Sequence, residues 1–346
     1  MPGVRDVDKF FKYDPATGQY NPELWRRALL LNWMYPDPNV TTNPFTIPAA
    51  GSPLRLFFRN PYSSGQGWDN GYGSPFEAKN LIFEDSTDGT AAANWTAAFQ
   101  EIGEARRFQN NPIHIRTIAG TAQTPALLRE QYWFPSAHVI QADLNKISGG
   151  AVNARMYFGG TQYYPWDADL RTNPAKFAKV QERIKKFANR RKFVTPFFLT
   201  LDSTPLTLTA GQTTQVTTKI GDDGHVELFA FTAVSTGNFG ITISEVKTKQ
   251  TLMNGQITQT NGIGTANFPA LFPLPYLVPA GYRLNFSFED LSNATNTIFI
   301  TLQGRKIWAP MLEPAKVEEL LRELQVPVAS DDAPAMADSL PTGWEV

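Results

Sequence analysis

The sequence contains no cysteine and only three histidines, His114, His138 and His225. The absence of thiols excludes disulfide bonds and thiolate metal centres. A histidine pair two residues apart is a common metal-ligand spacing, but Arg116 stands where the partner of His114 would be. His138 aligns with Tyr282 in the internal repeat described below, which favours a place in a strand over a metal ligand. We therefore expect no metal ion and no cofactor.

Long apolar runs and a net charge are also lacking. No stretch reaches 18 uninterrupted apolar residues, so we expect no membrane span, and the first residues lack the apolar core of a secretory signal. The 31 Lys and Arg residues balance 32 Asp and Glu residues, so the whole chain has no bulk attraction for nucleic acid. We find no glycine-rich phosphate loop and no serine elbow. We therefore expect a protein that is not an enzyme and has no catalytic residues.

The most informative feature that is present is an internal repeat. At an offset of 144 positions, residues 95–164 align with residues 239–308 without a gap. Sequence identity is low, but the prolines and glycines coincide, and each of them fixes a backbone turn that a fold needs. The matched pairs include Glu101 with Glu245, Gly120 with Gly264, Tyr132 with Tyr276, Pro135 with Pro279, and Gly160 with Gly304. Weaker matches upstream have offsets of 150 and 161 residues.

Both halves carry the pattern of short β-strands separated by turn residues. Such runs are Phe45–Ile47, Leu54–Phe58, Ile113–Arg116, Val139–Ala142 and Ala154–Phe158, then Leu206–Thr209, Tyr282–Phe288 and Ile298–Leu302. Roughly eight short strands per half are typical of a sandwich or small barrel. We predict a mainly β fold of two tandem jelly-roll-like β-sandwich domains related by the repeat, with short helices in the N-terminal arm, connector and C-terminal segment. The predicted domains are an N-terminal arm (1–44), a first jelly-roll-like domain (45–166), a basic helical connector (167–193), a second jelly-roll-like domain (194–309), and a C-terminal helix and tail (310–346).

The predicted connector helix begins at Pro174 and is the most strongly charged segment of the chain. Eight basic residues against Glu182 give it a charge of +7, which indicates contact with an acidic partner or with phosphates. We favour an acidic partner, because a single helix makes a small nucleic-acid site. The C-terminal helix offers one in Glu313, Glu318, Glu319 and Glu323. The basic candidates are Lys176, Lys179, Arg183, Lys185, Lys186, Arg190, Arg191 and Lys192.

Large aromatic side chains outside the predicted domains are candidates for assembly contacts, because they are costly to leave in water and make good anchors. Those of loop 59–75 could instead stack on a sugar ring. The interface candidates are Phe10, Phe11, Tyr13 and Trp25 in the arm, Tyr62, Trp68 and Tyr72 in the loop, and Trp344 in the tail.

Two paired segments, Tyr132–Leu144 and Tyr276–Phe288, share a proline-marked entry into a strand. The second continues through Asp290-Leu-Ser-Asn293 to a strand that ends in Gly304-Arg-Lys-Ile-Trp308. This pattern resembles bacteriophage virion proteins, and two such domains in one chain also resemble the double jelly-roll capsid proteins of tailless viruses. The second resemblance implies an N-terminal helical arm and trimers with a pseudo-sixfold outline, although this chain lacks the long tower insertions of larger members.

The resemblance implies a viral or bacteriophage structural protein that self-assembles into the capsid shell or an accessory head layer. We would then expect it in the virion, assembled in the host cytoplasm. Its partners would be copies of itself, in a trimer or larger assembly, and other virion proteins, with nucleic-acid contact possible but not favoured. The alternative function is a carbohydrate-binding β-sandwich module that recognises a receptor or surface glycan.

Overall fold

A computed structural model describes most of the two repeated halves and the helices that follow them. The described residues are 32–37, 40–42, 44–60, 75–85, 94–121, 124–135, 138–162, 174–202 and 205–324. The aromatic interface candidates of the arm, the loop and the tail therefore lie outside the described residues, as do the predicted helix after Pro22 and the predicted domain boundary at 166/167.

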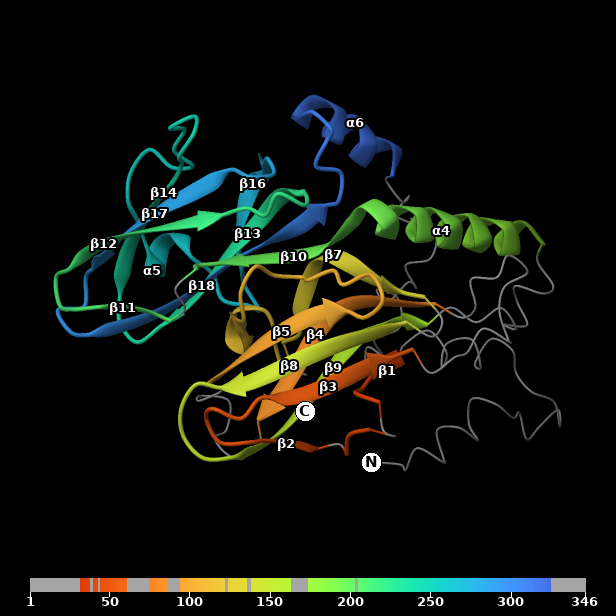
Figure 1. The fold of residues 1–346 in the computed structure, drawn as a ribbon, viewed down its shortest axis with the longest axis horizontal. Coiled ribbons are helices and arrows are strands. Elements are labelled where there is room, and N and C mark those ends of the chain that lie inside the picture. The colour runs from red at the N-terminus through yellow and green to blue at the C-terminus, as the bar shows by residue number, and fades with distance from the viewer. Residues whose placement is uncertain are drawn as a thin grey trace, which may run out of the picture.

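The chain forms two β units, each with two antiparallel sheets that face each other across an apolar core (Figure 1). In the first unit one sheet has the order β1-β9-β4-β7, with β2 also pairing with β9, and the other has the order β3-β8-β5-β6. Alternation of buried and exposed side chains, as in β5, directs one face of each strand into the core. The strands are β1 (Asn32–Met34), β2 (Phe45–Ile47), β3 (Leu54–Arg59), β4 (Phe76–Asp85), β5 (Trp95–Glu101), β6 (Ile113–His114), β7 (Ala126–Phe134), β8 (Val139–Lys146) and β9 (Val152–Gln162).

The second unit has the same arrangement of strands. One sheet has the order β10-β18-β13-β16, with β11 also pairing with β18, and the other has the order β12-β17-β14-β15. Its strands are β10 (Val194–Thr200), β11 (Leu206–Leu208), β12 (Thr213–Lys219), β13 (His225–Ser235), β14 (Phe239–Glu245), β15 (Ile257–Thr258), β16 (Ala270–Val278), β17 (Arg283–Asp290) and β18 (Asn296–Ile307). The fold is therefore mainly β, as the sequence predicts.

Strand bounds follow the register found in the sequence. Strands β5 to β9 begin at residues 95, 113, 126, 139 and 152, and β14 to β18 begin 144 residues later, at 239, 257, 270, 283 and 296. The weaker upstream offsets recur as well, because β4 and β13 differ by 150 residues and β2 and β11 by 161. Both units also interrupt their pairing at one place, opposite Gly160 in the first unit and Gly304 in the second.

Two local features differ from the sequence prediction. Residues 32–34, assigned to an arm outside the first domain, form β1, which pairs with β9 and buries Met34 in the first core. Three residues next to prolines are too short a run to show a strand period. The predicted strand Ile113–Arg116 is a two-residue strand followed by a 3-10 helix at Ile115–Thr117, because the chain turns there towards the second unit.

The two units meet through a buried interface that contains polar contacts. Thr117 and Thr301 share a hydrogen bond of 2.7 Å between their hydroxyl oxygens, and Gln303 donates to the Thr117 carbonyl at 3.0 Å. The Phe198 N–H of β10 donates to the Phe108 carbonyl, and the Phe198 side chain belongs to the core of the first unit. Buried hydrogen bonds of this kind fix the relative orientation of two packed surfaces, since shifting them would leave polar groups unpaired.

Three α-helices are described. They are α4 (Pro174–Phe193), the short α5 (Gln259–Gly262) and α6 (Pro314–Glu323). Helix α4 follows β9 and stacks Phe187 on Trp133 of β7, with ring centroids 4.8 Å apart. Helix α6 follows β18 and packs Val317 and Leu321 near Leu277, the residue that matches Trp133 in the repeat. Within the described residues, no helix is long and apolar enough to cross a membrane.

The interface between the units contains a buried histidine, which predicts a pH effect. His114 lies 4.3 Å from the ring of Phe299, and burial, aided by Arg116, lowers the pKa of His114 from 6.5 to about 4. The unfolded chain binds this proton more readily than the folded chain. The free energy of unfolding should therefore fall as pH falls from 6.5 towards 4, by about 3 kcal/mol from this one group.

We expect His114→Leu to remove this contribution. Equilibrium unfolding of wild type and variant between pH 7.5 and pH 4 measures it as a difference of slopes, which cancels the carboxylates that titrate in both proteins. Parallel pH profiles for the two proteins would contradict the assignment.

Candidate functional site

The end of α4 is bound to acidic side chains of the β units. Arg190 donates two hydrogen bonds of 2.8 Å to the two carboxylate oxygens of Glu130, a buried residue in β7. Arg305 of β18 approaches the same carboxylate at 3.5 Å and pairs with Glu227 of β13. One buried carboxylate therefore connects the helix, the first unit and the second unit, and two arginines compensate its charge.

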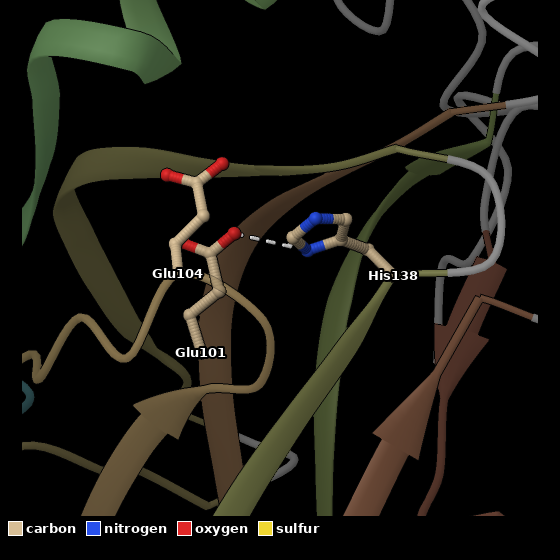
Figure 2. Close-up of side chains that lie close together, drawn as sticks. All are labelled: Glu101, Glu104 and His138. Atoms are coloured by element: carbon tan, nitrogen blue, oxygen red, sulfur yellow. Dashed lines mark ion pairs between the residues drawn. The ribbon is translucent and has the colours of Figure 1, made fainter.

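A second group of ionisable side chains lies beside the next arginine of α4. Glu101 at the end of β5, Glu104 in the following turn and His138 just before β8 converge, as Figure 2 shows. Their ligand atoms lie within 4.8 Å of one another, and His138 Nδ1 is 3.0 Å from Glu101 Oε1. By residue type and spacing these three side chains could hold a metal ion. We call them, together with Arg191, the Glu101 cluster.

Arg191 already supplies the positive charge of this cluster. Its Nη2 contacts Glu101 Oε1, lies 3.5 Å from Glu104 Oε1 and donates to His138 Nε2 at 2.8 Å. Burial lowers the pKa of Arg191 to about 10, so the guanidinium remains charged at neutral pH. A metal ion would have to occupy the space near the carboxylates that Arg191 fills. The cluster is thus better suited to fastening α4 than to holding a metal.

The contacts of His138 indicate its protonation state. Its Nδ1 faces the Glu101 carboxylate and can donate to it, while Nε2 accepts from Arg191, which requires a neutral ring. Burial lowers the pKa of His138, and nearby Glu104 opposes that shift in part. At neutral pH the ring therefore acts as a polar spacer between the carboxylate and the guanidinium.

The second unit uses the matching glutamate in another way. Glu245 accepts hydrogen bonds from the backbone N–H of Lys247 at 2.6 Å and of Thr248 at 3.0 Å, and from the Thr248 hydroxyl. Burial opposes ionisation, but these hydrogen bonds outweigh it and lower the pKa of Glu245. At the position of Thr248 the first unit has Glu104, a second carboxylate in place of a donor. The acidic pair in the first unit therefore needs a cation, and α4 provides it.

The outer edge of the second unit is exposed where that of the first unit is covered. Strand β7 is the edge strand of its sheet, and β10 and α4 lie against it. The matching edge strand β16 exposes 79 % of Leu274, whereas the matched residue Glu130 in β7 is 8 % exposed. Leu271 and Phe268 are exposed nearby, Phe268 to 75 %. An apolar edge of this kind is characteristic of interaction surfaces.

All eight basic residues predicted as partner contacts lie on α4. Arg190 and Arg191 contact acidic residues of the first unit, and Lys186 pairs with Glu182 within the helix at 3.0 Å. Among the side chains that the structure describes, no ion pair joins α4 to the four glutamates suggested in the C-terminal segment. Sequence reasoning missed Glu130, Glu101 and Glu104 as partners, and the only signal was the match of Glu101 with Glu245.

Comparisons with known proteins give no close relative. No protein-family model and no curated protein matches the sequence. Solved structures with some similarity include the VP2 subviral particle of infectious bursal disease virus, with 11% identity, a TM-score of 0.22, and coverage of 90% of this chain and 80% of that one. Others are the insecticidal delta-endotoxin Cry8Ea1 of Bacillus thuringiensis, with 8% identity, a TM-score of 0.20 and coverage of 80% and 60%, and the tandem CBM22-1-CBM22-2 domain of Paenibacillus barcinonensis Xyn10C, with 9% identity, a TM-score of 0.17 and coverage of 79% and 97%. These scores are too low to support an argument about function.

Proposed function

We propose that this chain is a structural protein of a virus or bacteriophage particle that acts by assembling with copies of itself. Each unit would be a jelly roll, because eight strand positions divide between two facing four-membered sheets in the order expected for that fold. The function would then lie in surfaces that repeat contacts, with no catalysis. The particle would be its location, as the shell or as an accessory layer.

The observation that carries this proposal is the unequal exposure of the two matching edge strands. Inside one chain, the β7 edge of the first unit is covered by β10 of the second unit. The corresponding β16 edge of the second unit, with Leu271 and Leu274, has no such cover among the described residues. The chain thus contains one finished copy of a contact and one open copy of it.

The structure suggests which surface of a second copy would complete the contact. Strand β10 pairs with residues 302–304 of β18 just as β1 pairs with the matching residues 158–160 of β9. β1 therefore occupies in the first unit the place that β10 occupies in the second. We propose that β16 of one copy packs against the β1 side of the next, a head-to-tail contact that closes into a ring such as a trimer.

We expect the double variant Leu271→Asp and Leu274→Asp to fold normally but to fail to assemble. Burying two carboxylates in an apolar contact would cost several kcal/mol, which exceeds the margin of a moderate interface. Analytical ultracentrifugation with negative-stain electron microscopy would measure assembly, and circular dichroism would verify the fold. Met311→Asp is the matched control, since Met311 is 95 % exposed on another segment.

A monomeric wild-type protein at high concentration would contradict the proposal, as would a double variant that assembles like wild type. The alternative of sugar recognition rests on Tyr62, Trp68 and Tyr72, which lie outside the described residues. Saturable binding to a glycan array by a protein that does not assemble would favour that alternative.

A further inference from the structure

The outer surface of α4 retains positive charge that the β units do not compensate. Lys179, Lys185 and Lys192 are exposed, and among the described side chains no ion pair reaches any of them. Lys185 and Lys192 are seven residues apart, so they lie on one side of the helix, about 10 Å apart along its axis. We call Lys179, Lys185 and Lys192 the α4 basic face.

The C-terminal tail, residues 325–346, leaves the described structure next to α4. The carbonyl of Leu324, the last described residue, accepts a hydrogen bond of 3.1 Å from Arg190 Nη1. The tail therefore starts at the end of the helix that carries Lys192. It contains four acidic residues and no lysine or arginine; the acidic residues are Asp331, Asp332, Asp338 and Glu345.

Chain length allows the acidic residues to reach the basic face. Asp331 is seven residues beyond Leu324, and an extended chain of that length spans up to about 24 Å. Along the helix axis, Lys185 lies about 8 Å and Lys179 about 16 Å from Arg190. Asp331 and Asp332 can therefore meet Lys185 without strain, and Asp338 can reach farther along α4.

We propose that the tail of each chain binds along the α4 basic face of the same chain, with Asp331 and Asp332 near Lys185 and Lys192. Each exposed ion pair contributes only about 0.2–1 kcal/mol, so no single pair holds the tail. Several pairs act together because the tail is tethered at Leu324, which gives it a high effective concentration. The contact is electrostatic and weakens as salt screens the charges. This inference does not depend on the proposed assembly, because it concerns contacts within one chain.

Zero-length carbodiimide cross-linking of the full chain, followed by mass spectrometry, tests the proposal. We expect cross-links between Lys185 or Lys192 and Asp331 or Asp332 at about 0.05 M salt, and their loss at about 1 M salt. Mixing isotope-labelled and unlabelled chains distinguishes links within a chain from links between chains. Predominantly mixed-isotope links would overturn the assignment to the same chain.

Charge reversal provides the second arm of the test. Lys185→Glu with Lys192→Glu should remove the hydrogen-exchange protection of residues 325–346, and adding Asp331→Lys with Asp332→Lys should restore it. The matched control reverses two other exposed lysines, Lys249 and Lys316, and should leave the protection unchanged.

Three results would overturn the proposal. The first is a tail without protection or cross-links at low salt. The second is tail protection that survives Lys185→Glu with Lys192→Glu but is lost in the Leu271→Asp and Leu274→Asp variant, which would place the tail on β16. The third is salt-dependent retention of single-stranded or duplex DNA by Lys185 and Lys192 with the tail unprotected, which would assign the basic face to nucleic acid.

Discussion

Replacing Gly304 with alanine is expected to lower the free energy of unfolding by at least about 3 kcal/mol. A Cβ atom at Gly304 would lie 2.0 Å from the Glu227 carbonyl oxygen of the neighbouring strand, and a Cβ at Gly160 would lie 1.9 Å from the Glu77 carbonyl. Both glycines stand opposite the interruption in pairing, where the backbones approach too closely for a side chain. Neither carbonyl can move without breaking the sheet.

Gly150→Ala is the control for this prediction. Gly150 lies in the turn between β8 and β9, and an added Cβ there meets no atom within 4 Å. We expect a change within about 0.5 kcal/mol. Denaturant unfolding followed by tryptophan fluorescence would compare the three variants. Similar stabilities for Gly304→Ala and Gly150→Ala would show that the close approach is not needed by the fold.

Glu130→Gln is expected to destabilise the protein by about 3–5 kcal/mol, because it leaves Arg190 and Arg305 partly buried without their shared carboxylate. The loss should be accompanied by faster hydrogen exchange in the last turns of α4, which Arg190 fastens to β7. Hydrogen exchange read by mass spectrometry would detect both effects in one experiment.

Glu84→Gln is the matched control for Glu130→Gln. Its partner Arg155 forms an ion pair of 3.0 Å across β4 and β9, but both side chains are largely exposed. An exposed pair contributes less than about 1 kcal/mol, and its loss should not affect α4. Equal destabilisation by the two substitutions would mean that the Glu130 carboxylate does not connect the helix to the two β units.

The unequal use of the matched glutamates shows how a repeated sequence acquires distinct roles. Glu245 is satisfied by its own turn through Lys247 and Thr248, so the second unit needs nothing from outside at this place. Glu101 shares its place with Glu104 and recruits Arg191. One changed donor in a turn therefore decides which unit binds α4.

The sequence by itself determined the features that depend on local sterics and periodicity. The 144-residue register could be found because prolines and glycines fix turns wherever they occur, and the strand bounds carry the same offset. The start of α4 at Pro174 and the start of α6 at Pro314 followed from the helix-initiating preference of proline. The charge of α4 was likewise evident from composition alone.

Only the tertiary structure decided which distant residues meet. Glu130 lies 60 positions from Arg190, and nothing local to either residue marks the other as its partner. Strand β1 was assigned to an arm because three residues show no period, and its place depends on pairing with β9. The exposed edge at Leu274 and the covered edge at Glu130 have matching positions in the repeat, and they differ because β10 and α4 reach only the first unit. Contacts of this kind depend on how the two units dock, which is a property of the assembled surfaces and leaves no periodic signal in the chain.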